Sequence, residues 1–118
     1  MTETPKMTKR PVGRKADPAT AILAEVKAAR KAVAYDRMPL AGGLVPVKGR
    51  EHHLREARRW EGVEDARRLT DMPGWDSTLI PALYGALAEQ DMQHARDGLV
   101  RLAALAVAAV EDIDREAG

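Results

Sequence analysis

Residues 91–115 read DMQHARDGLVRLAALAVAAVEDIDR, and this stretch decides the fold of the chain. Its apolar residues recur at steps of three and four, which places them along one side of a helix. They are Met92, Ala95, Leu99, Leu102, Ala103, Ala106, Val110 and Ile113. Alanine is the best helix former, and its small side chain lets a neighbouring helix approach closely. We therefore predict one long C-terminal helix, capped by the Asp91 carboxylate, that other helices must cover.

The composition of the 118-residue chain favours an all-α fold. There is no Phe and there are two Trp and two Tyr, so the core must be built from Ala, Leu, Val and Ile. An alanine-rich core with few β-branched runs favours helices over sheets. The chain has no Cys, which excludes disulfides and thiolate metal sites. No apolar leader precedes Lys15, and Arg101 interrupts the most apolar stretch, so we expect a cytoplasmic protein with no membrane partner.

The positions of Pro and Gly residues divide the chain into a tail and one helical domain over 17–118. We predict a small bundle of three to four helices, over about 18–35, 50–71, 77–89 and 91–115, with a Gly- and Pro-rich connector at 38–49. Gly62 indicates a kink or break, Asp76 or Ser77 a cap, and Pro81 a position in or near the first helical turn. The short link at Gln90 predicts antiparallel packing of the last two helices, with the long helix also contacting the helix before them.

The N-terminal tail, residues 1–16, is basic and is predicted to be disordered. Its cations are Lys6, Lys9, Arg10, Arg14 and Lys15, opposed by Glu3. A flexible basic arm could bind nucleic acid by releasing counterions, or could serve as a solubilising tail. Both interpretations stay open. Adjacent His52 and His53 should point to different sides of a helix, and we interpret both, with His94, as surface histidines, so we predict no metal site from them.

Four segments together resemble a known family. They are Trp60-Glu61-Gly62, Gly74-Trp75, Leu79 to Glu89, and Arg96 to Arg115. In order and in hydrophobic pattern they are similar to the all-α nucleotide pyrophosphohydrolases, the MazG-like group, especially the short versions common in actinobacteria and their phages. The resemblance covers about half of the chain. It implies an all-α scaffold and, as one expectation, a phage-encoded protein.

The family's chemistry uses Glu-x-x-Glu on one helix and Glu-x-x-Asp on the next, because magnesium requires hard carboxylate oxygens. The resemblance aligns Ala82 and Gly85 with the first pair, and Gly98 and Arg101 with the second. All four ligands are then replaced, and Arg101 carries a positive charge where a cation would bind. The resemblance therefore implies a degenerate metal motif and no cofactor.

These observations predict a non-catalytic MazG-like binding or assembly protein. Its packing or oligomer face would contain Leu99, Leu102, Ala103, Ala106 and Val110. Because alanine-rich helices bury little area alone, we expect a homo-oligomer or a protein partner. One alternative is an active magnesium-dependent pyrophosphohydrolase that uses displaced carboxylates, at least three of which would have to converge. Another is a nucleic-acid-associated or particle structural protein that acts through its basic arm.

Overall fold

The computed structural model describes residues 17–117, which form four helices and no strand. They are α1 (Pro18–Lys31), α2 (Pro46–Leu69), α3 (Trp75–Ala88) and α4 (Met92–Ala117). The predicted all-α fold with a long C-terminal helix is confirmed. None of these helices is long and apolar enough to cross a membrane.

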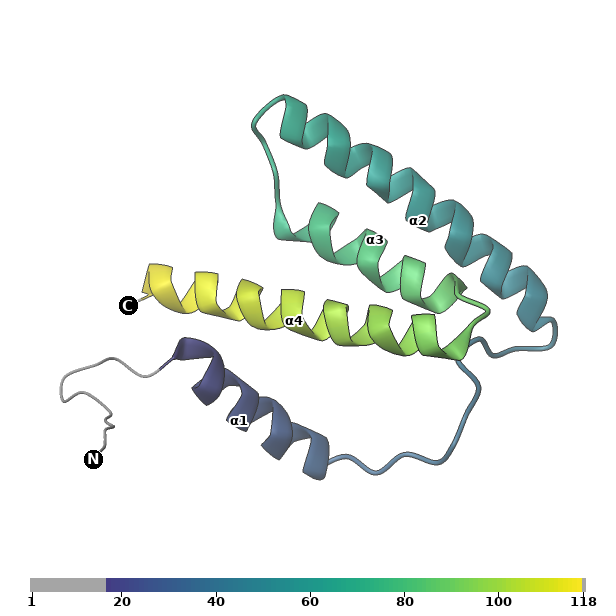
Figure 1. The fold of residues 1–118 in the computed structure, drawn as a ribbon, viewed down its shortest axis with the longest axis horizontal. Coiled ribbons are helices and arrows are strands. Elements are labelled where there is room, and N and C mark those ends of the chain that lie inside the picture. Colours follow the sequence, from purple (N-terminus) through teal and green to yellow (C-terminus); the bar gives the residue numbers. More distant parts are fainter. Residues whose placement is uncertain (1–16, 118) are drawn as a thin grey trace, which may run out of the picture.

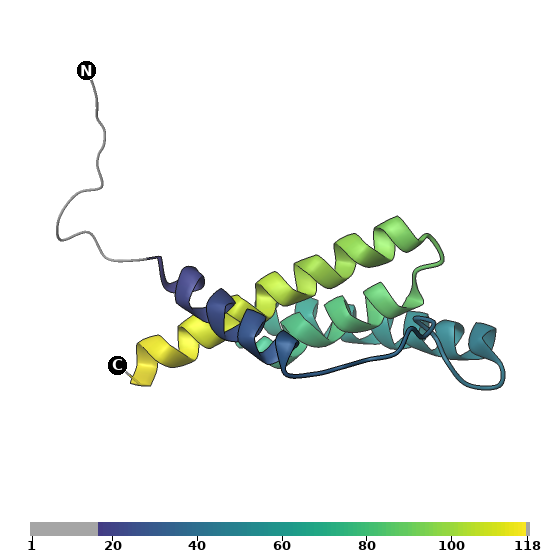
Figure 2. The same cartoon turned by 90° about the horizontal axis from the view of Figure 1, so that it is seen from below.

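The helices α2, α3 and α4 follow one another as antiparallel neighbours, with α3 in the middle (Figure 1). Helix α1 packs on α4 alone and crosses its C-terminal half (Figure 2). The predicted packing of α4 on α3 is therefore found. Its predicted contact with α2 is wrong, because α3 lies between the two helices and α1 takes the other side of α4.

Local signals set the bounds of α1 and of the connector that follows. The Asp17 carboxylate accepts a hydrogen bond from the Ala19 amide at 3.1 Å, and Pro18 occupies the first helical position. The helix ends at Lys31, earlier than predicted, and the Arg30 guanidinium donates to the Val33 carbonyl at 3.0 Å. Because Pro46 is pre-set for a first helical position, α2 starts four residues before the predicted one, and the connector spans 32–45 rather than 38–49.

Helix α2 runs through Gly62 without interruption, so the predicted kink or break is wrong. No atom of a neighbouring segment lies within 4 Å of where a Gly62 Cβ would be, and the helical hydrogen bonds on both sides hold the backbone. The helix ends in a Schellman motif, with Asp71 in the left-handed region at φ 58°. In this motif the Met72 amide donates to the Arg67 carbonyl at 2.7 Å.

Helix α3 starts at Trp75, so neither Asp76 nor Ser77 is its N-cap. Gly74 holds that position, and the Ser77 hydroxyl instead donates to the Gly74 carbonyl at 3.2 Å. The earlier start places Pro81 inside the helix rather than in its first turn, and its ring is buried. The predicted Asp91 cap of α4 is confirmed, since its carboxylate accepts from the Gln93 amide at 2.8 Å and the His94 amide at 3.2 Å.

The core of the described chain is small in both number and size of side chains. Among residues 17–117, the buried apolar side chains are Ile22, Ala57, Pro81, Ala86, Ala95 and Ala109. Helices α3 and α4 pack closely at Gly98, where an added Cβ would lie 3.0 Å from the Ala86 Cβ. Large apolar side chains remain exposed along α1 and α4, among them Leu23 at 54 % and Val100 at 54 %. This chain alone therefore buries little of its apolar surface.

Candidate functional site

The four positions aligned with the family's metal ligands line one hollow between α3 and α4. Ala82 and Gly85 come from α3, and Gly98 and Arg101 come from α4. The hollow has a volume of about 170 Å³, and its lining is completed by Pro81, Ala86, Glu89 and His94. The structure thus brings together all four residues that the sequence comparison singled out.

The chemistry of this hollow does not fit magnesium. Of the described residues that line it, Glu89 supplies a carboxylate, whereas Arg101 supplies a fixed positive charge and His94 an imidazole. A magnesium ion prefers several carboxylate or water oxygens in an octahedral arrangement. Ala82, Gly85 and Gly98 have no donor atom in their side chains. No reaction step through a bound metal follows from these residues.

Elsewhere in residues 17–117, His, Asp and Glu side chains form no group of three or more that could hold a metal ion. His52 and His53 lie on α2 beside Tyr84 of α3, with ring centroids 6.2 Å and 5.8 Å from the tyrosine ring. His94 lies at the start of α4, far along the chain from both. The three histidines do not belong to one metal-binding group.

An apolar groove with a volume of about 550 Å³ lies between α1 and α4. Helix α1 contributes Ala19, Ile22, Leu23 and Val26, and α4 contributes Val100, Ala103, Ala104, Ala106, Val107, Val110 and Glu111. The C-terminal end of α1 diverges from α4 in Figure 1, and the two helices cross in Figure 2. Ile22, at 4 % exposed, is the buried contact on the α1 side.

The residues of the predicted packing face of α4 lie in different surroundings in the structure. Leu102 is half-buried, whereas Ala103, Ala106 and Val110 are exposed and line the α1–α4 groove. Leu99 lines a second apolar hollow, with Leu40 of the connector and Met92. The sequence analysis missed Val100 and Val107, which also line the groove. The sequence does indicate them, because Val100, Ala103, Val107 and Val110 follow one another at steps of three and four.

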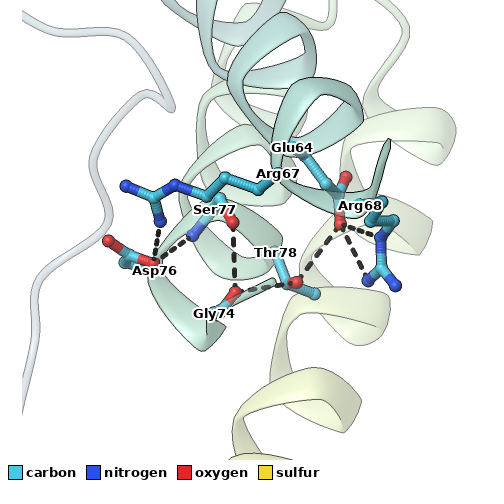
Figure 3. Close-up of polar contacts among 7 residues, drawn as sticks. All are labelled: Glu64, Arg67, Arg68, Gly74, Asp76, Ser77 and Thr78. Atoms are coloured by element: carbon cyan, nitrogen blue, oxygen red, sulfur yellow. Dashed lines mark hydrogen bonds and ion pairs between the residues drawn. The ribbon is translucent and has the colours of Figure 1, made fainter. Parts of the chain in front are cut away.

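Away from the α1–α4 groove, polar contacts join α2 to α3. At the turn between α2 and α3, Arg67 pairs with Asp76 at 2.8 Å, and the Glu64 carboxylate accepts from the Thr78 hydroxyl at 3.2 Å (Figure 3). Arg68 also donates to Glu64, at 3.2 Å. These contacts tie the end of α2 to the first turn of α3.

A further polar contact ties α3 to α4. The Trp75 indole N–H donates to the Asp112 carboxylate at 2.9 Å, and Arg115 pairs with the same carboxylate at 2.9 Å. The Trp75 hydrogen bond, followed by the Arg115 contact, lowers the pKa of Asp112 below its ordinary value. The pKa of Asp91 is lowered in the same direction by the hydrogen bonds from the His94 and Gln93 amides. Both carboxylates are therefore charged at neutral pH, and neither is set up for proton transfer there.

The basic residues of the tail, Lys6, Lys9, Arg10, Arg14 and Lys15, lie outside the described residues. Comparisons with protein-family models, curated proteins and solved structures found no match for this chain. The proposed function therefore rests on the fold, the α3–α4 hollow and the α1–α4 groove.

Proposed function

We propose that this chain is a non-catalytic helical binding or assembly protein built on a MazG-like scaffold. The observation that carries the proposal is the α3–α4 hollow. The positions that the resemblance aligns with four metal-binding carboxylates meet there, yet they carry Ala82, Gly85, Gly98 and Arg101. A guanidinium in place of an acidic ligand repels a divalent cation, and three positions without side-chain oxygens cannot replace it.

The binding role is supported by the apolar surface of α1 and α4. Monomeric proteins rarely expose large contiguous apolar patches, and such patches commonly mark interaction sites. Here the patch lines a groove of about 550 Å³, whereas the buried core of the described chain is mostly alanine. Covering the groove would remove from water the leucine and valine side chains that the chain itself leaves exposed. A protein surface is the occupant whose chemistry matches this lining.

Pyrophosphate release tests the non-catalytic proposal. The purified full chain is incubated with each of the common ribo- and deoxyribonucleoside triphosphates and magnesium, and pyrophosphate is measured. We expect no release above that of the buffer. Release that elutes with the protein and is lost in Glu89→Gln would refute the proposal, because Glu89 is the described carboxylate in the hollow.

An active enzyme with displaced carboxylates is the alternative, and magnesium binding tests it separately. Titration calorimetry with magnesium alone should show no binding beyond weak, salt-sensitive association. The matched variant is Arg101→Asp, which restores one acidic position while leaving the α3–α4 contact at Gly98 unchanged. We expect this single carboxylate to be insufficient as well, because one or two oxygens do not complete a magnesium site.

A further inference from the structure

The side of α4 that lines the α1–α4 groove carries a seam of residues whose spacing is the same in both directions along the helix. Its six residues follow one another at steps of four, three, four, three and four, the spacing of a coiled-coil seam. They are Arg96, Val100, Ala103, Val107, Val110 and Asp114. Helix α4 spans all of them, and each except the half-buried Val107 is exposed. An apolar centre is therefore bounded by a cation at one end and an anion at the other.

We propose that this seam binds the same seam of a second copy of the chain, with the two α4 helices antiparallel. In that register Arg96 lies opposite Asp114 of the second copy, Val100 opposite Val110, and Ala103 opposite Val107. Each residue of the seam then meets another member of the seam, and both ends form pairs of opposite charge. A parallel pairing would instead bring Arg96 against Arg96 and Asp114 against Asp114. This inference rests on the proposed binding function, and it names the partner.

Charge along the whole of α4 favours the same direction. Its last two turns carry Glu111, Asp112, Asp114 and Glu116 against Arg115, whereas its first half carries Arg96 and Arg101 against Asp97. Antiparallel helices bring the acidic end of one copy to the basic half of the other. Opposite charges flanking an apolar seam set the orientation of paired helices.

The size of the side chains also suits a second helix. Ala103, Ala104 and Ala106 at the middle of the α4 wall have small side chains, which allow the backbone of another helix to approach closely. Helix α1 then flanks each α4, so α1 and α4 of both copies would form a four-helix layer. Leu23 and Val26 of α1, both half or more exposed in one copy, lie on the rim of that groove.

Sedimentation equilibrium of the full chain tests the proposal first. We expect a dimer that dissociates on dilution and that Ala103→Glu converts to a monomer, because this substitution puts a charge at the centre of the seam. The matched control is Ala66→Glu on the exposed surface of α2, which should leave the dimer intact. Circular dichroism confirms that both variants keep their helical content. A wild-type chain that stays monomeric up to millimolar concentration overturns the inference.

Charge exchange tests the register without risk to the fold. Arg96→Asp and Asp114→Arg should each raise the dissociation constant at least about fivefold, since two-fold symmetry places two like-charge contacts in every dimer. The double variant should return close to the wild-type constant. Arg96 and Asp114 are about 27 Å apart along one helix, so the rescue cannot arise within a single chain. Absence of rescue overturns the antiparallel register.

The lack of native cysteine makes disulfide trapping unambiguous. Ala106→Cys lies close to the two-fold axis of the proposed dimer and should form a disulfide between copies on mild oxidation. Met92→Cys, on the same helix, should not, because the two copies of residue 92 would be about 39 Å apart. The opposite result would show a parallel pair and overturn the inference. None of these results bears on pyrophosphate release, so failure of the dimer and failure of the non-catalytic proposal remain distinguishable.

Discussion

Helix α4 packs against a neighbour on two sides, and the two contacts differ in kind. Toward α3 it presents Gly98, which allows an approach of about van der Waals distance to Ala86, and a hydrogen bond from Trp75 to Asp112 closes the far end. Toward α1 the same helix presents valines and alanines, and about 550 Å³ remains between the two helices. The α3 side of α4 is therefore closed by contacts within the chain, whereas the α1 side is open.

The difference shows that apolar composition alone does not decide which side of a helix is buried. Small residues and a directional polar contact define the α3 side, where even Ala86 and Ala95 are fully covered. On the α1 side, a helix of 14 residues crosses α4 and covers part of it. The valines Val100, Val107 and Val110 lie on this open side, where their full burial requires another surface.

The largest expected effect is on the open side, from Ile22→Ala. Ile22 is the large apolar residue of α1 that is buried, and truncating such a side chain costs about 2 kcal/mol or more. We expect α1 to undock from α4 while α2 and α3 stay folded, because α1 has no contact with either. Hydrogen exchange followed by mass spectrometry should show lost protection in α1 alone.

Leu69→Ala is the matched control for that experiment. Leu69 ends α2 and is 88 % exposed, so its truncation should change the free energy of unfolding by no more than about 0.5 kcal/mol. Equal loss of protection in all four helices of the Ile22→Ala variant would contradict the comparison. It would show that α1 is needed for the whole fold rather than only for the open side.

An intermediate effect is expected on the closed side, from Trp75→Phe. This substitution keeps an aromatic ring but removes the N–H that donates to Asp112. We expect a lower free energy of unfolding at pH 7, smaller in size than the Ile22→Ala effect, because the carboxylate keeps its contact with Arg115. Urea denaturation measures it.

The pH dependence of that loss follows from the direction of the Asp112 pKa shift. A pKa lowered in the folded state means that the charged carboxylate stabilises the fold. This contribution is fully present above the ordinary aspartate pKa of about 4, and it disappears as the pH falls through the lower folded value. The difference between wild type and Trp75→Phe should therefore shrink below pH 4. Trp60→Phe, whose ring lies beneath the Arg59 guanidinium, should show no such convergence.

Much of the fold could be predicted from the sequence because its signals are local. Asp17-Pro18 and Asp91 mark helix starts through caps that depend on neighbouring residues only, and both were correct. The start of α3 was misplaced because its first residue, Trp75, is fixed by a partner 37 residues away. The contact between α4 and α2 was wrong for the same reason, since the order of helices in space depends on long-range packing.

The candidate sites show the same limit. Four residues of the α3–α4 hollow were named from the family resemblance, and the i, i+3 spacing of Ala82 with Gly85 and of Gly98 with Arg101 places each pair on one helix face. The α1–α4 groove could not be predicted, because nothing local tells a helix which of its two apolar sides α3 will cover. The face predicted from 99 to 110 mixed residues from both sides.

The smallest expected change in the free energy of unfolding comes from two glycine-to-alanine substitutions in helix interiors. They test how tightly α3 and α4 pack on the closed side. An added Cβ at Gly85 meets no atom within 4 Å, whereas at Gly98 it would lie 3.0 Å from the Ala86 Cβ. Alanine stabilises a helix interior by about 0.5–1 kcal/mol relative to glycine. Gly85→Ala should therefore raise the free energy of unfolding by that amount. Gly98→Ala should gain nothing or lose stability, because α3 and α4 must move apart to admit the methyl group.

A double variant separates the close contact from helix propensity. Ala86→Gly removes the atom that the new methyl group would meet, at the cost of a glycine in the interior of α3. If the contact is the cause, Gly98→Ala should become stabilising in the Ala86→Gly background, and urea midpoints of the four proteins give the coupling between the two sites. The opposite outcome is that Gly98→Ala stabilises the wild-type background as much as Gly85→Ala does. It would show that α3 and α4 can move apart at little cost in free energy. The contrast between a closed and an open side of this helix would then be lost.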